Sequence, residues 1–358
     1  MNTLINTLVR PEIRRLKAYF VPDARGLIKL DAMENPYTWP ESLRREWLRL
    51  LSRVDVNRYP DPQASALQEI LREALDLPEE MGLILGNGSD ELIQMLALMV
   101  ARPKQTVLSV DPGFVMYRLI SRWAGLDYRG VSLKAGDFSL DEAALHQALA
   151  EHRPALLFLA YPNNPTGNLF EHAALEKLIE AAPGLVVLDE AYRPFTDQSF
   201  LPRLGDWPNL LVMGTVSKMG LAGLRLGFLA GPPDWLAELH KTRLPYNINV
   251  LTQVSAAFAL KHRAVFAEQT QRIRRERERL FTALAQMQGI QPYPSEANFI
   301  LLRVQTQPAP RLFESLKAKG ILVKNLDGTH PLLEDCLRVT VGRPEENEAF
   351  LQALSSSL

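Results

Sequence analysis

A lysine followed by small residues and an arginine forms the most reactive pattern in this chain. Ser217 and Lys218 follow an apolar run in GTVSKMGLAGLRLGF, and Arg225 comes seven residues after the lysine. The small residues between them allow another group to approach the backbone closely. A partly desolvated lysine in such a loop serves as an amine nucleophile. Lys218 is therefore a candidate catalytic residue, although a lysine in a loop is most often a solvated charge.

Two carboxylates end another apolar run, in VVLDEAYRPF. Asp189 and Glu190 close this run, and Tyr192 follows them. A carboxylate at the end of a buried strand is costly in free energy unless it is paired. We therefore expect a cationic partner for this pair.

Two turns have residues suited to holding a ligand. In GNGSDE, a glycine turn at 86–88 leads into a helix opened by Ser89 and Asp90, which brings free backbone N–H groups and the positive helix end together. A phosphate would fit there, although a glycine turn with such a cap is also an ordinary helix start. In YPNNPTG at 161–167, two prolines exclude helix and sheet and present asparagine amides in fixed orientation.

The elements that must position these motifs are short apolar runs alternating with longer amphipathic segments. This alternation is typical of parallel strands joined by helices, and it predicts an α/β fold. Open parallel sheets bind ligands beyond the carboxyl ends of their strands, so we expect the motifs to lie together. The predicted strands are 82–85, 106–110, 155–160, 185–190, 210–215 and 225–231. The predicted helices include 65–75 and 265–287, the latter with a charged face that we interpret as solvated.

Composition and length exclude several classes of protein. With 358 residues, 47% of them hydrophobic and 23% charged, the chain is expected to form a large domain plus a smaller one. The sequence pattern changes after about residue 244, and we expect the large domain over 36–245 and the smaller one from 1–35 and 246–358. A formal net charge of -1 argues against nucleic acid or membrane partners. The single cysteine, Cys336, and the absence of an apolar leader favour a cytoplasmic location, and no metal site is expected.

The motifs together resemble the fold type I aminotransferases, which depend on pyridoxal 5'-phosphate (PLP). GNGSDE, YPNNPTG, DEAY and SKMGLAGLRLGF stand in the order of that family, over most of the chain. Within this class the chain is most similar to the histidinol-phosphate aminotransferases, through LDAMENPY, RYPDPQ, PYNINVLTQ, ANFILLR and CLRVTVG. The resemblance implies a large domain with a mostly parallel central sheet flanked by helices, and a smaller α+β domain.

The resemblance also implies roles at the cofactor ring. Lys218 would carry PLP as a Schiff base and later move a proton, and Asp189 would pair with the pyridine nitrogen. Asn164 and Tyr192 would hydrogen-bond the phenolic oxygen. Phe114 would stack on the ring.

Phosphate and substrate contacts follow from the same resemblance. Residues implied to hold the cofactor phosphate are Gly88, Ser89, Asp90, Ser217 and Arg225, with Tyr59 reaching the phosphate of a second subunit, so a homodimer is expected. Residues implied to bind substrate are Tyr19, Asn247, Lys324 and Arg338. Two features depart from the family pattern: Arg225 follows Lys218 one residue earlier than usual, and Lys324 stands where an arginine is common.

The predicted reaction transfers an amino group between L-histidinol phosphate and 2-oxoglutarate, giving imidazole acetol phosphate and L-glutamate in histidine biosynthesis. Its partners would be a small-molecule amino donor and a 2-oxo acid. An aromatic or other amino acid aminotransferase, or a threonine-phosphate decarboxylase, remain alternatives on the same fold. A PLP-binding regulator without catalysis, or a purely structural protein, is the alternative from a different class.

Overall fold

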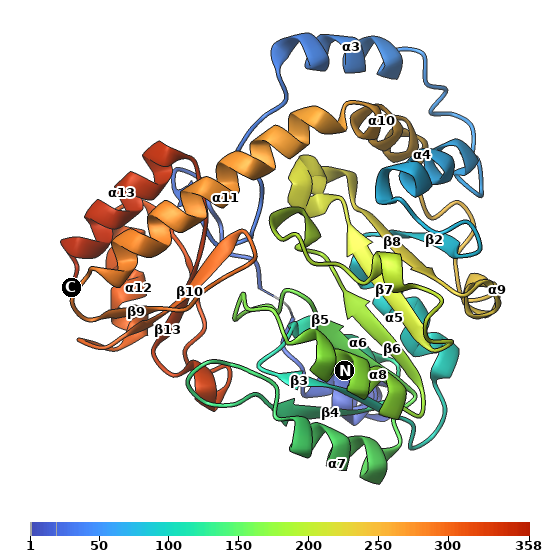
Figure 1. The fold of residues 1–358 in the computed structure, drawn as a ribbon, viewed down its shortest axis with the longest axis horizontal. Coiled ribbons are helices and arrows are strands. Elements are labelled where there is room, and N and C mark those ends of the chain that lie inside the picture. The colour runs from blue at the N-terminus through green and yellow to red at the C-terminus, as the bar shows by residue number, and fades with distance from the viewer. Residues whose placement is uncertain (1, 19) are drawn as a thin grey trace.

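The computed structural model describes residues 2–18 and 20–358, and its largest element is a seven-stranded sheet (Figure 1). The strand order is β2-β8-β7-β6-β5-β3-β4. The strands are β2 (Gly82–Asn87), β3 (Thr106–Asp111), β4 (Asp127–Ser132), β5 (Leu156–Ala160), β6 (Leu185–Asp189), β7 (Leu210–Thr215) and β8 (Leu226–Gly231). Neighbouring strands pair in parallel except at β8, which is antiparallel to both β2 and β7. The predicted α/β fold with a mostly parallel sheet is confirmed.

Helices cover both faces of this sheet, which is why every residue of β5, β6 and β7 is buried. The helices of this part are α3 (Glu41–Leu51), α4 (Ser65–Leu75), α5 (Ser89–Val100), α6 (Val115–Trp123), α7 (Glu142–His152), α8 (His172–Ala181), α9 (Pro233–His240) and α10 (Val250–Lys261). All six predicted strands are present. The edge strand β4 was not predicted, because its sequence DYRGVS is largely exposed and lacks the apolar run that marks the buried strands.

A second unit contains an antiparallel sheet in the order β12-β13-β10-β9. Its elements are α11 (Arg263–Ala285), β9 (Ile290–Pro292), β10 (Phe299–Val304), α12 (Ala309–Ala318), β12 (Lys324–Asn325), β13 (Cys336–Thr340) and α13 (Pro344–Ser355), and β1 (Ile28–Lys29) pairs in parallel with β11 (Ile321–Leu322) beside it. The predicted boundary at 245/246 falls before α10, which packs against α3 and α4 beside the large sheet. The chain starts with α1 (Asn2–Leu8) and α2 (Pro11–Arg14). None of the described helices is both long and apolar enough to span a membrane.

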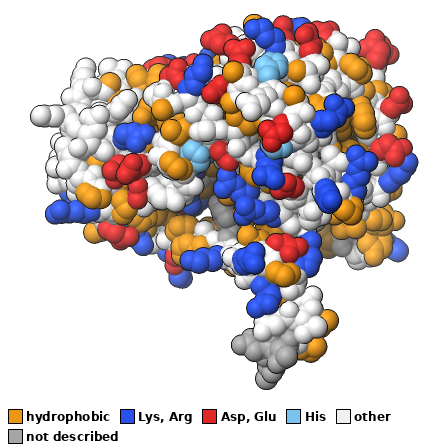
Figure 2. All heavy atoms as spheres, turned by 90° about the horizontal axis from the view of Figure 1, so that it is seen from below, with side chains coloured by type: hydrophobic (Ala, Val, Ile, Leu, Met, Phe, Trp, Pro, Cys, Tyr) orange, Lys and Arg blue, Asp and Glu red, His pale blue; other side chains and the backbone are white. Residues whose placement is uncertain are grey.

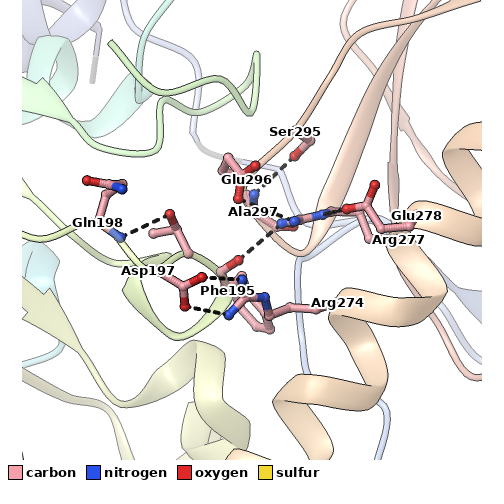
Figure 3. Close-up of polar contacts among 10 residues, drawn as sticks. Phe195, Asp197, Gln198, Arg274, Arg277, Glu278, Ser295, Glu296 and Ala297 are labelled. Carbon is pink, nitrogen blue, oxygen red and sulfur yellow. Dashed lines mark hydrogen bonds and ion pairs between the residues drawn. The ribbon is translucent and has the colours of Figure 1, made fainter. Parts of the chain in front are cut away.

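Helix α11 joins the two units, and its charged residues are not all solvated (Figure 3). Arg272 pairs with Glu268 on the exposed face, as the sequence predicts. Arg277 departs from this expectation: it is 4% exposed and donates to the carbonyls of Phe195, at 3.2 Å, and Ala297, at 3.1 Å. Phe195 belongs to the large unit and Ala297 to the small one, so this arginine connects the two.

Candidate active site

A cavity of about 350 Å³ lies at the carboxyl ends of β5, β6 and β7. All four motifs contribute to its wall, as the strand pattern predicted. The predicted site residues in this wall are Ser89, Asp90, Phe114, Asn164, Asp189, Tyr192, Ser217, Lys218 and Arg225. The sheet therefore brings together residues that are far apart in the sequence.

Asp189 ends β6 and is buried, at 3% exposure. The Tyr117 hydroxyl donates to its Oδ2 at 2.7 Å, and the Ala191 N–H donates to its Oδ1 at 3.0 Å. Burial raises the pKa of Asp189 to about 6, and these two hydrogen bonds act against that rise. Among the described residues, no Lys, Arg or His forms an ion pair with this carboxylate. The cationic partner expected from the sequence is therefore not found for Asp189 among the described residues.

Lys218 lies in the helical turn Ser217–Leu221 that follows β7. Its ammonium donates to the Ala32 carbonyl at 3.4 Å and lies 5.9 Å from the centre of the Tyr192 ring. Burial, and after it the positive charge of Arg338, lowers the pKa of Lys218 to about 8. A neutral, nucleophilic amine is therefore accessible at a much lower pH than for a solvated lysine.

The turn between β2 and α5 packs tightly against β8. A Cβ on Gly227 would lie 2.6 Å from the Gly88 carbonyl carbon and from the Ser89 nitrogen, and a Cβ on Gly88 would lie 2.5 Å from Nη2 of Arg225. Gly88 also has φ +80°, a conformation that favours glycine. The N-terminal N–H groups of α5, with Arg225 beside them, form a cradle with the donors that bind a phosphate.

The short spacing between Lys218 and Arg225 is accommodated by two consecutive turns. The turn Ser217–Leu221 is followed by Ala222–Leu224, and Arg225 then adopts a left-handed conformation with φ +50°. Both side chains reach the same cavity in spite of the missing residue. Arg225 pairs there with Asp90 at 3.3 Å.

A second cavity of about 310 Å³ shares Met33, Phe114 and Asn164 with the first. It contains Arg338 and Lys324, which face each other in register on β13 and β12. Arg338 donates to Oδ1 of Asn164, whose amide nitrogen in turn donates to the Tyr192 hydroxyl at 3.0 Å. Figure 2 shows Lys and Arg side chains gathered around a hollow near the middle of the face seen from below.

The structure does not bring every predicted residue to these cavities. The Asn247 amide donates to the Leu85 carbonyl at 3.0 Å and to Glu91 at 2.7 Å, behind the turn between β2 and α5. Tyr59 is 81% exposed and stacks on Tyr246 with ring centres 4.5 Å apart. Tyr19 lies outside the described residues. The roles of all the site residues toward a ligand stay predictions.

Sequence reasoning missed four residues near the cavities. Tyr117, which binds Asp189, lies three residues after Phe114 on α6, and that helical spacing was the available signal. Asp111 and Arg118 form an ion pair in the wall of the second cavity, together with His330. His330 comes from a loop of the small unit, and no local pattern indicates that it meets residues of the large sheet.

Comparisons with known proteins agree with this geometry. Residues 25–354 match the family described as aminotransferase class I and II. A relative from Nitrosococcus oceani named histidinol-phosphate aminotransferase 2 is 58% identical over 348 residues, which is 97% of this chain and 96% of the relative. A relative of the same name from Cupriavidus pinatubonensis is 52% identical over 361 residues, or 99% and 98% of the two chains.

The fold is similar to a solved histidinol-phosphate aminotransferase from Sinorhizobium meliloti in complex with pyridoxal-5'-phosphate. The TM-score is 0.87 at 24% identity, over 98% of this chain and 97% of that chain. At this identity the likeness concerns the fold.

Proposed function

The chain belongs to the class I and II aminotransferases, and we propose that it transfers an amino group between L-histidinol phosphate and 2-oxoglutarate with PLP bound at Lys218. The observation that carries this proposal is the meeting of Lys218, Asp189 and the glycine cradle in one cavity. Each of the three matches a different part of the cofactor: its aldehyde, its ring nitrogen and its phosphate.

The cofactor would supply an electron-withdrawing ring that stabilises negative charge at the substrate carbon. Asp189 would keep the ring nitrogen protonated by presenting a carboxylate from the end of β6. Asn164 and Tyr192, already hydrogen-bonded to each other at 3.0 Å, would place donors at the phenolic oxygen. Phe114 would cover one face of the ring, since its side chain lines the cavity.

Lys218 has two tasks in this proposal. Its amine would first hold the cofactor covalently. Once released by the amino group of a substrate, the free amine would act as the base that takes the proton from the substrate carbon and delivers it to the cofactor carbon. The lowered pKa of Lys218 favours both tasks, because the neutral amine is the form that attacks the cofactor aldehyde and the form that accepts a proton.

The substrate would bind in the second cavity through its anionic group. Arg338 suits either the carboxylate of glutamate or the phosphate of histidinol phosphate in bidentate geometry. Lys324 lies beside Arg338 in register and adds a second positive charge. A phosphate dianion is stabilised more by this charge than a carboxylate is. The names of the relatives support histidinol phosphate as the amino donor.

A homodimer in the cytoplasm is the assembly and location we propose. Tyr59 is 81% exposed, does not line the cavity of its own chain, and stacks on Tyr246. Other large apolar residues exposed in the segments around these two tyrosines and on α3 and α10 are Leu48, Leu50, Val56, Leu244 and Leu251. A second copy that covers them would let Tyr59 reach the partner's cofactor phosphate, the role that the family resemblance implies for it.

A single-turnover experiment tests the proposed substrate. The holoenzyme is mixed in parallel with L-histidinol phosphate, L-phenylalanine and L-threonine phosphate, and the loss of the cofactor absorbance band is followed. Fast bleaching by histidinol phosphate alone is the expected result. Faster bleaching by another amine would assign that amine as substrate, and carbon dioxide release from threonine phosphate would indicate a decarboxylase.

Gel filtration of the active enzyme at the mass of a monomer would contradict the homodimer.

A further inference from the structure

Tyr117 contacts the Asp189 carboxylate of the candidate site from outside the cavity. Its side chain is 1% exposed and does not belong to the cavity wall, yet its hydroxyl donates to Oδ2 of Asp189 at 2.7 Å. The other oxygen of Asp189 accepts from the Ala191 N–H. The carboxylate is thus held on one side by the backbone of its own loop and on the other by a side chain from α6.

The Tyr117 ring is fixed by its surroundings. It stacks on Phe158 of β5 with centres 4.8 Å apart and an interplanar angle of 8°. Phe114, expected to cover the cofactor ring, meets it edge to face at 5.4 Å and 84°. The Ser121 hydroxyl donates to the Tyr117 carbonyl at 2.6 Å, one helical turn later. A ring held in this way directs its hydroxyl in one direction only.

We propose that Tyr117 is a positioning residue that keeps Asp189 ionised and oriented toward the ring nitrogen of the cofactor. The inference rests on the proposed function, since the ring nitrogen belongs to PLP. A buried carboxylate loses the hydration that stabilises its charge, and a hydroxyl donor replaces part of that hydration. Without the donor, the carboxylate would be neutral over more of the working pH range and its plane would be free to turn.

The pKa values support this role. The pKa of Asp189 is raised to about 6 by burial, and the Tyr117 hydrogen bond is the largest influence that lowers it. The pKa of Tyr117 itself is raised well above its ordinary value, first by burial and then by the charge of Asp189, so the phenol keeps its proton and donates. Removing the hydroxyl therefore moves the pKa of Asp189 upward.

Other groups around Asp189 do not replace this donor. Asp90 on α5 raises the pKa of Asp189, and Lys218 after β7 lowers it through its charge. The remaining titratable neighbours are Glu190 and Tyr192. Both follow Asp189 on the same strand end, and neither donates a hydrogen bond to it in the described structure.

The test compares Tyr117→Phe with Tyr293→Phe in the holoenzyme. Tyr293 is also buried, at 7% exposure, but its hydroxyl accepts from Nε of Arg303 at 3.1 Å and it lines neither cavity. Each variant loses one hydrogen-bonded hydroxyl and keeps its ring. Two quantities are measured: the rate of PLP release into buffer, and the pH profile of the half-reaction with glutamate.

We expect Tyr117→Phe to release PLP roughly tenfold faster and to shift the acid limb of the profile upward by about one pH unit, the effect of losing one hydrogen bond to a charged group. Tyr293→Phe should match the wild type in both. In an Asp189→Asn background, where no charge needs the donor, adding Tyr117→Phe should leave PLP release unchanged.

Three results would overturn the inference: an unshifted profile and unchanged PLP release in Tyr117→Phe, the same changes in both single variants, or a full additional effect in the Asp189→Asn background. Both proteins in the last comparison lack the Asp189 charge and differ only in the Tyr117 hydroxyl. If Tyr117→Phe acted through a general loss of folding, it would speed PLP release in this background as well. A wild-type protein that binds no PLP would instead refute the proposed function, and the inference with it.

Discussion

Replacing Arg277 by methionine should destabilise the protein more than any nearby surface change. The buried guanidinium donates to the carbonyls of Phe195 and Ala297 and pairs with Glu296 at 3.3 Å (Figure 3). Methionine keeps the apolar stem of the side chain but removes every donor. Two buried carbonyls then lose a partner, at about 1–3 kcal/mol each. Because Glu296 is 43% exposed, we assign little to its ion pair.

The expected loss is about 2–6 kcal/mol in the free energy of unfolding, the sum for the two carbonyls. An unfolding entropy of about 2.1 cal/mol/K per residue, over 358 residues, converts this loss into a melting temperature lower by about 3–8 °C. Thermal unfolding followed by circular dichroism, at saturating PLP, measures the shift.

Arg275→Met is the matched control, because Arg275 lies on the same helix and is exposed. Its melting temperature should stay within about 1 °C of the wild type, as for most surface substitutions. Equal melting temperatures for the two variants would refute the assignment of Arg277 as the buried connection between the two units.

Further predictions concern the cofactor and substrate contacts. Gly227→Ala should weaken PLP binding roughly 10- to 100-fold in equilibrium dialysis. The new Cβ would lie 2.6 Å from backbone atoms of the cradle and would displace its charge-assisted donors, so unchanged binding would contradict the tight packing. The rate at which apo-protein recombines with PLP should rise with pH and level off above about 8, the pKa of Lys218, because only the neutral amine reacts; a rate that still climbs toward 10.5 would indicate a solvated lysine. Arg338→Lys should lower kcat/KM about 10- to 100-fold for glutamate and histidinol phosphate alike, through loss of bidentate binding, and an effect on one substrate only would place the other elsewhere.

Much of the site could be predicted because each motif directly follows a strand. Lys218 follows β7, Asp189 ends β6 and Asn164 lies just beyond β5. In a parallel sheet these carboxyl ends meet at one edge, so order along the chain was enough to predict that the side chains share a cavity. The pattern of charged and apolar residues within a segment determines whether that segment forms a helix or a strand, and this pattern can be seen in the sequence.

What could not be predicted depends on contacts between distant segments. The hydrogen bond from Tyr117 to Asp189 joins residues 72 apart, and the helical spacing of Tyr117 from Phe114 indicates that the two lie on one side of a helix but not which residue Tyr117 contacts. The charged stretch of α11 looks uniformly solvated, but the helix turns Arg277 inward between two units. Asn247 lies behind the cradle and binds Glu91, a placement set by the packing of the segment before α10.

The central claim is that Lys218 carries the cofactor, and borohydride reduction followed by peptide mass spectrometry tests it most directly. Reduction fixes PLP to the amine that holds it, and digestion then locates the added mass. We predict that the label lies on the peptide containing Lys218 and that Lys218→Ala abolishes both the label and the yellow colour. A label on Lys324 or another lysine, or a colourless protein that gains no label after incubation with PLP, would contradict the account.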